Sequence, residues 1–187
     1  MRAVTRKEVF QMGLRARGAV DRIYVHWTAG HYDQPCREYH LSITGTGGVY
    51  ASCEELTTLL SHTWHRNSGA VGMALCCCHD AVLYADRSFD LGRGPPTVLQ
   101  VEECAILCFL LAEALGIPID PRSIMTHAEA ADLDGYGPAL AGTPRFERWD
   151  LYRLMDHDGV WRSGGDVIRG KALWYRYHRR PDLPYLH

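Results

Sequence analysis

Two histidines stand at the ends of two apolar segments that are far apart in the chain. His26 lies near the end of residues 22–27, and His127 ends residues 123–127. Small residues come soon after each histidine, at positions 28–30 and at Ala128, and leave room above the sheet. Because neighbouring strands of a sheet lie about 4.8 Å apart, two imidazoles at strand ends can bind one metal ion. The pattern therefore predicts a zinc site at one rim of a sheet.

A third ligand is needed to complete such a site. Catalytic zinc usually has three protein ligands and keeps its fourth position open for water. Acidic residues that follow His127 are the candidates, and spacing alone does not choose among them: Glu129, Asp132, Asp134 and Asp150.

Predicted strands and helices alternate along the chain, which is typical of an α/β domain. Five strands are expected, at residues 22–27, 39–44, 47–52, 70–78 and 123–127. Thr5 and Glu8 have the spacing of a capping box, which predicts a short helix after Thr5. Over residues 98–115 apolar residues recur with helical spacing, and Gly116 ends that helix. We therefore predict a single α/β domain with a central mixed β-sheet and flanking helices.

The chain divides into three segments in this interpretation. Residues 1–21 form an N-terminal extension, residues 22–160 the catalytic region, and residues 161–187 a C-terminal tail rich in Trp, Tyr and Arg that packs on the domain. Gly, Pro and Ala dominate residues 135–144, which predicts a loop.

Composition limits the classes of function. A chain of 187 residues suits one domain, and the net charge of −2 gives no electrostatic footprint for nucleic acid. No apolar run approaches the roughly 18 residues that a membrane-spanning helix needs, so no membrane insertion is expected. The N-terminus lacks the continuous apolar stretch of a signal peptide. We expect synthesis in the cytoplasm.

The seven cysteines favour reduced thiols over a disulfide framework. Three are consecutive, at residues 76–78, where neighbouring side chains of a strand point to opposite faces. Cys36 or Cys53 as a nucleophile, with a histidine as base, would instead give a wall peptidase with a thiol mechanism. This remains an alternative to the zinc site.

Five segments, taken in order, carry a resemblance to a known family. They read YVHWTAG, EYHLSITGTGGVY, HTWHRNSGAVGMAL, IMTHAEA and RWDL. Over Arg22 to Leu151 the chain resembles the type-2 N-acetylmuramoyl-L-alanine amidases, which include amidase-type phage lysozymes and the peptidoglycan recognition proteins. The resemblance implies a zinc hydrolase of peptidoglycan. It would cleave the amide between the lactyl group of N-acetylmuramic acid and the L-alanine of the stem peptide.

The resemblance also implies the metal ligands. His26 and His127 match the two histidine ligands, and Asp150 in RWD matches the third ligand. Arg148 takes the place of a basic residue that stabilises the transition state, where the family usually has lysine. The separation of His127 from Asp150 is longer than in compact members, which leaves Asp134 as a rival ligand.

Further residues with implied catalytic roles lie in the central motifs. Tyr39 matches a tyrosine that some members place beside the metal-bound water, and His65 matches a histidine that faces the cleft. Other members carry a glutamate in the central strand, but this chain has Ala74 there. Glu129 is expected to orient a ligand imidazole from outside the metal site.

Aromatic and polar residues of the same segments are expected to contact substrate. Trp27, Trp64 and Tyr136 offer stacking faces, while Arg66 and Asn67 offer hydrogen bonds.

Two functions other than zinc amidase activity remain open from sequence alone. One is a non-catalytic peptidoglycan-binding module, and the other is the thiol peptidase described above. As an amidase the chain would act on cell-wall peptidoglycan after release or injection, as a phage endolysin or an antibacterial effector with a cognate inhibitor protein. Recycling of soluble muropeptides in the cytoplasm is a further option.

Overall fold

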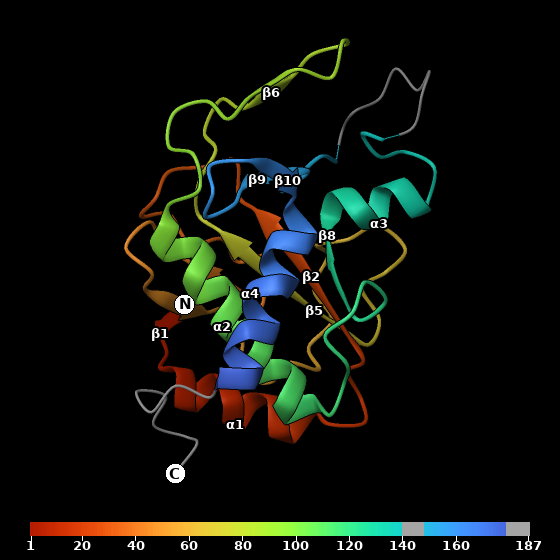
Figure 1. Ribbon diagram of the computed structural model, residues 1–187. Coiled ribbons are helices and arrows are strands. Elements are labelled where there is room, and N and C mark those ends of the chain that lie inside the picture. The colour runs from red at the N-terminus through yellow and green to blue at the C-terminus, as the bar shows by residue number, and fades with distance from the viewer. Residues whose placement is uncertain (140–147, 179–187) are drawn as a thin grey trace.

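Six strands form the central sheet, in the order β1-β4-β3-β5-β2-β8 (Figure 1). The computed structural model describes residues 1–139 and 148–178. β5 is parallel to β2 and β3, β8 is parallel to β2, and β4 is antiparallel to β3 and β1. The strands are β1 (Arg2–Ala3), β2 (Arg22–Trp27), β3 (Leu41–Ile43), β4 (Val49–Ala51), β5 (Ala70–Leu75) and β8 (Ile124–Thr126). The prediction of one α/β domain with a mixed sheet is confirmed.

Three helices pack against one another beside the sheet, with α2 (Val98–Leu115) between α1 (Arg6–Ala16) and α4 (Gly164–His178) (Figure 1). Capping boxes explain where two of them begin, since the side chains of Thr5 and Thr97 each accept a hydrogen bond from the backbone three residues on. The box at Thr5 was predicted from the sequence, and the structure adds the one at Thr97. α2 ends at Gly116, whose φ of 76° lies in the left-handed region that favours glycine. Both helices match the sequence prediction.

Alternating side chains of β2 point to opposite faces of the sheet. Ile23, Val25 and Trp27 join the main hydrophobic core, which includes most of the buried face of α2. Tyr24 joins a smaller cluster on the other face, together with Met125 and Ala130. His26 has the same parity as Tyr24, so its side chain also lies on this second face, away from the main core.

Helix α3 (His127–Leu133) follows β8 directly. The expectation that His127 ends a strand is wrong by one residue, because Thr126 caps a helix that begins at His127. A capping box between Thr126 and Glu129 accounts for this start. β8 lies beside β2 with Val25 opposite Thr126, so His26 and His127 emerge at the same edge of the sheet.

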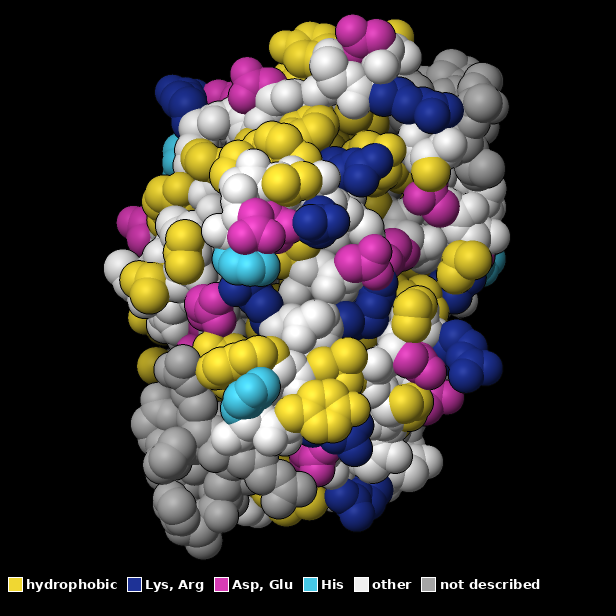
Figure 2. Space-filling view, viewed as in Figure 1, with side chains coloured by type: hydrophobic (Ala, Val, Ile, Leu, Met, Phe, Trp, Pro, Cys, Tyr) yellow, Lys and Arg dark blue, Asp and Glu magenta, His cyan; other side chains and the backbone are white. Residues whose placement is uncertain are grey.

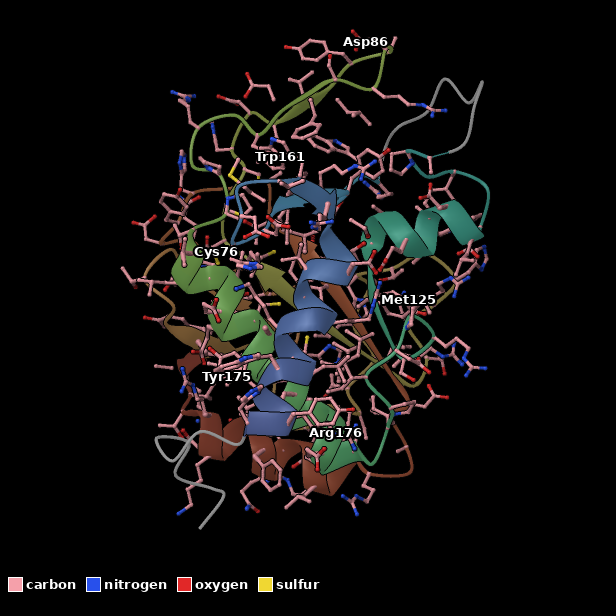
Figure 3. The ribbon with its side chains drawn as sticks, viewed as in Figure 1. Cys76, Asp86, Met125, Trp161, Tyr175 and Arg176 are labelled. Atoms are coloured by element: carbon pink, nitrogen blue, oxygen red, sulfur yellow. The ribbon has the colours of Figure 1, made fainter. Side chains whose placement is uncertain are left out.

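Two small hairpins were not expected from the sequence. β6 (Val82–Leu83) and β7 (Phe89–Asp90) form one that projects from the body of the domain, with Asp86 at its tip (Figure 3). The other pairs β9 (Arg153–Met155) with β10 (Trp161–Ser163) and leads directly into α4.

Both terminal segments are part of the same fold. β1 pairs with β4, and α1 packs against α2. α4 packs against α2 and β8, so residues 161–178 lie on the domain. Of the loop expected at residues 135–144, residues 140–144 lie outside the described part of the chain. The predicted strand at residues 70–78 ends earlier, at Leu75.

Charges of both signs are interspersed on the face shown in Figure 2, which agrees with the small net charge of −2. Within residues 1–139 and 148–178, no helix has the length and apolar character required to cross a bilayer.

Candidate metal centre

His26, His127 and Asp150 converge on one point although they come from three separate parts of the chain. The two Nδ1 atoms lie 3.0 Å apart, and each lies 3.3 Å from Oδ2 of Asp150. All three residues are buried. The predicted ligand residues are therefore brought together, and they form a group that can hold a metal ion.

The spacing and chemistry of this group fit zinc. Nitrogen and oxygen ligands at the usual 2.0–2.1 Å from a tetrahedral ion lie about 3.3 Å from one another. The three observed separations are close to that value. His127 and Asp150 also line a cleft of 530 Å³, which leaves one side of the group accessible.

Burial prepares the group for a cation. It lowers the pKa of His26 to about 4, so this imidazole is neutral at pH 7 and has a lone pair to offer. Burial alone would raise the pKa of Asp150, but hydrogen bonds with His127 and His26 outweigh it and hold that pKa well below its usual range. The group therefore combines neutral nitrogen and an ionised carboxylate, as zinc ligation requires.

A tight turn carries Asp150 to the start of α3. The amide of Ala128 donates a hydrogen bond to the backbone carbonyl of Asp150, at 3.3 Å. The backbone amide of Tyr152 donates to the backbone carbonyl of Trp149, at 2.8 Å. Leu151 between them is completely buried and has a φ of 57°. The turn thus fixes the aspartate next to His127.

Asp134, the rival third ligand, is engaged elsewhere. Its carboxylate oxygens accept two hydrogen bonds of 2.6 Å from the guanidinium of Arg66. This ion pair lowers the pKa of Asp134. The same guanidinium donates a hydrogen bond to the Tyr24 hydroxyl, so Arg66 connects Asp134, at the end of α3, with β2. Arg66 is not among the residues that line the cleft.

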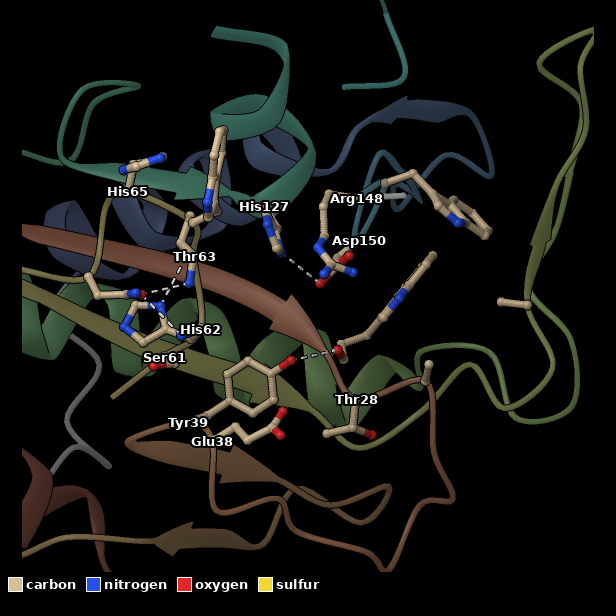
Figure 4. Close-up of a pocket in the computed structure, with 16 residues that line it drawn as sticks. Thr28, Glu38, Tyr39, Ser61, His62, Thr63, His65, His127, Arg148 and Asp150 are labelled. Carbon is tan, nitrogen blue, oxygen red and sulfur yellow. Dashed lines mark hydrogen bonds and ion pairs between the residues drawn. The ribbon is translucent and has the colours of Figure 1, made fainter. Parts of the chain in front are cut away.

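Tyr39 and Arg148 line the same cleft as Asp150 (Figure 4). The Tyr39 ring lies 4.9 Å from the ring of His26, and its hydroxyl donates to the backbone carbonyl of Trp27 at 3.4 Å. Burial raises the pKa of this phenol well above its ordinary value, so it stays protonated and acts as a donor. The structure thus brings both predicted residues to the metal group.

The remaining predicted substrate contacts differ in their exposure. Trp64 is 62% exposed at the cleft and packs on His65 with ring centres 3.9 Å apart. Trp27 also lines the cleft, but it is buried and packs edge-on against Trp149. Asn67 accepts hydrogen bonds from the backbone amides of His62 and Thr63, which gives it a structural role in the loop.

Glu129 is placed away from the ligand imidazoles. As the capping-box residue of α3 it bends back to accept a hydrogen bond from the amide of Thr126. Its two oxygens also accept from Arg169 of α4, at 2.9 and 2.8 Å. The expected contact with a ligand imidazole is not among its hydrogen bonds, because a capping box directs the carboxylate toward the residue before the helix.

His62 and Thr63 are site residues that sequence reasoning missed. Thr63 Oγ1 lies 3.2 Å from Nε2 of His26 and 3.0 Å from Nδ1 of His62, and both residues line the cleft. The segment HTWH contains two histidines, and the prediction chose the exposed His65 over the buried His62. No local sequence pattern distinguishes His62 and Thr63, because polar Ser61 precedes them and their role depends on contact with His26.

The thiols lie outside the site. All seven cysteines are free, as expected, and neither Cys36 nor Cys53 lines the cleft. Burial raises the pKa of Cys53, which disfavours the thiolate that a nucleophile needs. These positions give no support to a thiol peptidase.

No protein-family model and no curated protein sequence matches the chain. The amidase resemblance therefore rests on the five motifs and on the site that their residues form.

Proposed function

We propose that the protein is a zinc-dependent N-acetylmuramoyl-L-alanine amidase that acts on peptidoglycan. One observation carries the proposal: two imidazole nitrogens and a carboxylate oxygen, all from predicted ligand residues, lie 3.0–3.3 Å apart at an accessible cleft. Two nitrogens and one oxygen with an open fourth position are the ligand set of many catalytic zinc sites.

A zinc ion held by His26, His127 and Asp150 would act as a Lewis acid and make water available as a nucleophile near neutral pH. One carboxylate against a divalent ion leaves the centre with a net positive charge. This charge suits it to attack on an amide, whose carbonyl oxygen becomes negative in the transition state.

Arg148 and Tyr39 supply the groups that such a reaction needs around the metal. Arg148 brings a permanent positive charge to the cleft, which can stabilise the oxyanion. A guanidinium stays protonated in proteins, so Arg148 does not donate the proton to the leaving amine. Tyr39, a protonated phenol in the same cleft, can hold the substrate carbonyl or relay a proton, and His65 at the cleft can also relay a proton.

The open part of the cleft suits a sugar joined to a peptide. Trp64 presents a largely exposed ring on which a sugar face can stack. Glu38, exposed beside Tyr39, adds a carboxylate to the lining. These contacts extend along one cleft, as expected for a glycopeptide that crosses the metal centre.

Digestion of purified sacculi tests the proposal. The zinc-loaded protein should release stem peptides that begin with a free L-alanine amine, detected by mass spectrometry, and His26→Ala should release none. Cleaved cross-links with intact lactyl amides would point to an endopeptidase. Binding of sacculi without any soluble product would support a recognition module.

A further inference from the structure

Behind the metal ligand His26 lies a short chain of polar side chains on the second face of the sheet. Nε2 of His26 is 3.2 Å from Oγ1 of Thr63, and this oxygen is 3.0 Å from Nδ1 of His62 (Figure 4 shows the Thr63 and His62 side chains). His26 is completely buried, and Thr63 is 1% exposed. Bulk water therefore does not replace these contacts.

The protonation pattern of this chain follows from the chemistry of a ligand histidine. A metal-binding Nδ1 must present a lone pair, so the neutral ring carries its proton on Nε2. In the structure this Nε2–H faces Thr63 Oγ1, which accepts it. The hydroxyl hydrogen of Thr63 is then free to donate to Nδ1 of His62. One threonine hydroxyl thus contacts one ring nitrogen of each imidazole.

We propose that Thr63 is a positioning residue for the metal centre: its hydroxyl holds the Nε2–H of His26, so that Nδ1 faces His127 and Asp150. The inference rests on the proposed function and identifies the partner that orients one ligand, a task that the sequence had assigned to Glu129. His62 acts through Thr63, since its Nδ1 is the acceptor that fixes the hydroxyl.

The surroundings fix both members of the chain. Oδ1 of Asn67 accepts hydrogen bonds from the amides of His62 (3.0 Å) and Thr63 (2.7 Å), which sets the backbone of this segment. A side chain at Gly72 of β5 would bring its Cβ within 2.5 Å of the His62 ring. The strand therefore leaves just enough room for that imidazole.

Zinc affinity, measured by competition with a chromophoric chelator, tests this role apart from catalysis. Removal of a partner that orients a ligand histidine typically weakens metal binding about 10–100-fold. Thr63→Val should show a loss in that range, and Thr63→Ser, which keeps the hydroxyl, should restore affinity to within about threefold of wild type. Thr44→Val is the matched control, because the Thr44 hydroxyl serves a turn between β3 and β4.

Cobalt substitution adds a spectroscopic readout. The visible absorption of bound Co²⁺ reports ligand geometry, so Thr63→Val should change the spectrum while Thr63→Ser and Thr44→Val should not. Thr63→Ala replaces Thr63→Val if the valine variant does not fold. Wild-type affinity and spectrum in the folded variant that lacks the hydroxyl would overturn the inference and leave the zinc site intact. A wild-type chain that binds no divalent ion would overturn the proposed function as well.

Discussion

Single residues decide which side chains can hold a metal ion, and the clearest contrast is between two aspartates. Asp150 lies 3.3 Å from both ligand nitrogens, whereas Asp134 is held by Arg66 through two hydrogen bonds. We predict that Asp150→Asn weakens zinc binding by more than about 100-fold, because loss of a ligand costs more than loss of its outer partner. Asp134→Asn should bind zinc as wild type does. Equilibrium dialysis with zinc measures both variants.

The opposite order of effects would identify Asp134 as the ligand. Sequence reasoning named both aspartates because Asp150 lies 23 positions after His127 and spacing over such a length carries little information. The choice is made by the turn at Leu151, a buried leucine with positive φ that no sequence pattern announces. Likewise, the roles of Arg66 and Glu129 depend on partners, Asp134 and Arg169, that lie 68 and 40 residues away.

At the scale of secondary structure, helix α3 presents His127 and depends on α4 for its position. Arg169 of α4 is 5% exposed and donates to both Glu129 oxygens and to the carbonyl of Ile124 at the start of β8. This ion pair therefore joins the helix that carries a ligand to the C-terminal helix.

We predict that Glu129→Gln lowers the free energy of unfolding by about 1–3 kcal/mol, because it removes one of the two carboxylates that pair with the buried Arg169 guanidinium and leaves only Asp166. Urea denaturation of the metal-free protein measures this loss. Zinc content after reconstitution should stay at the wild-type level, since Glu129 makes no hydrogen bond to either ligand imidazole among its observed contacts. Loss of zinc at unchanged stability would instead support the role that the sequence suggested.

Helix α4 also shows which elements sequence patterns miss. Its segment begins with Gly164 and Gly165 and contains Gly170, and glycine is a poor helix former. The helix is stabilised instead by packing of residues such as Ile168 and Ala172 against the domain. By contrast, the bounds of α2 were predictable, because its capping box, its apolar spacing and Gly116 all act locally.

For the whole molecule, buried neutral histidines couple folding to pH. Burial lowers the pKa of His62 to about 3 and also lowers that of His40, whose ring nitrogens bond to Thr58 and Gly72. In the unfolded chain these residues titrate near the ordinary value of about 6.5. Between these pKa values the unfolded state binds more protons, so stability must fall as the pH falls.

We predict that the metal-free protein loses about 2 kcal/mol of unfolding free energy between pH 7 and pH 5 through His62 alone. His40 should add to this loss in the same direction. Urea denaturation at pH 7 and at pH 5 measures this loss of unfolding free energy. His62→Gln should make the loss smaller. His157→Gln, at a residue whose side chain is 82% exposed, serves as the control and should leave it unchanged. A stability that rises on acidification would contradict the neutral, buried state of these rings.

Anomalous diffraction at the zinc absorption edge, from crystals of the zinc-loaded protein, tests the metal centre most directly. We predict a single strong peak about 2.0–2.1 Å from Nδ1 of His26, Nδ1 of His127 and a carboxylate oxygen of Asp150. A second group of potential ligands, Asp156, His157 and Asp158, lies elsewhere on the molecule and provides an internal comparison. Zinc at that group alone, with no peak between the buried histidines, would contradict the account.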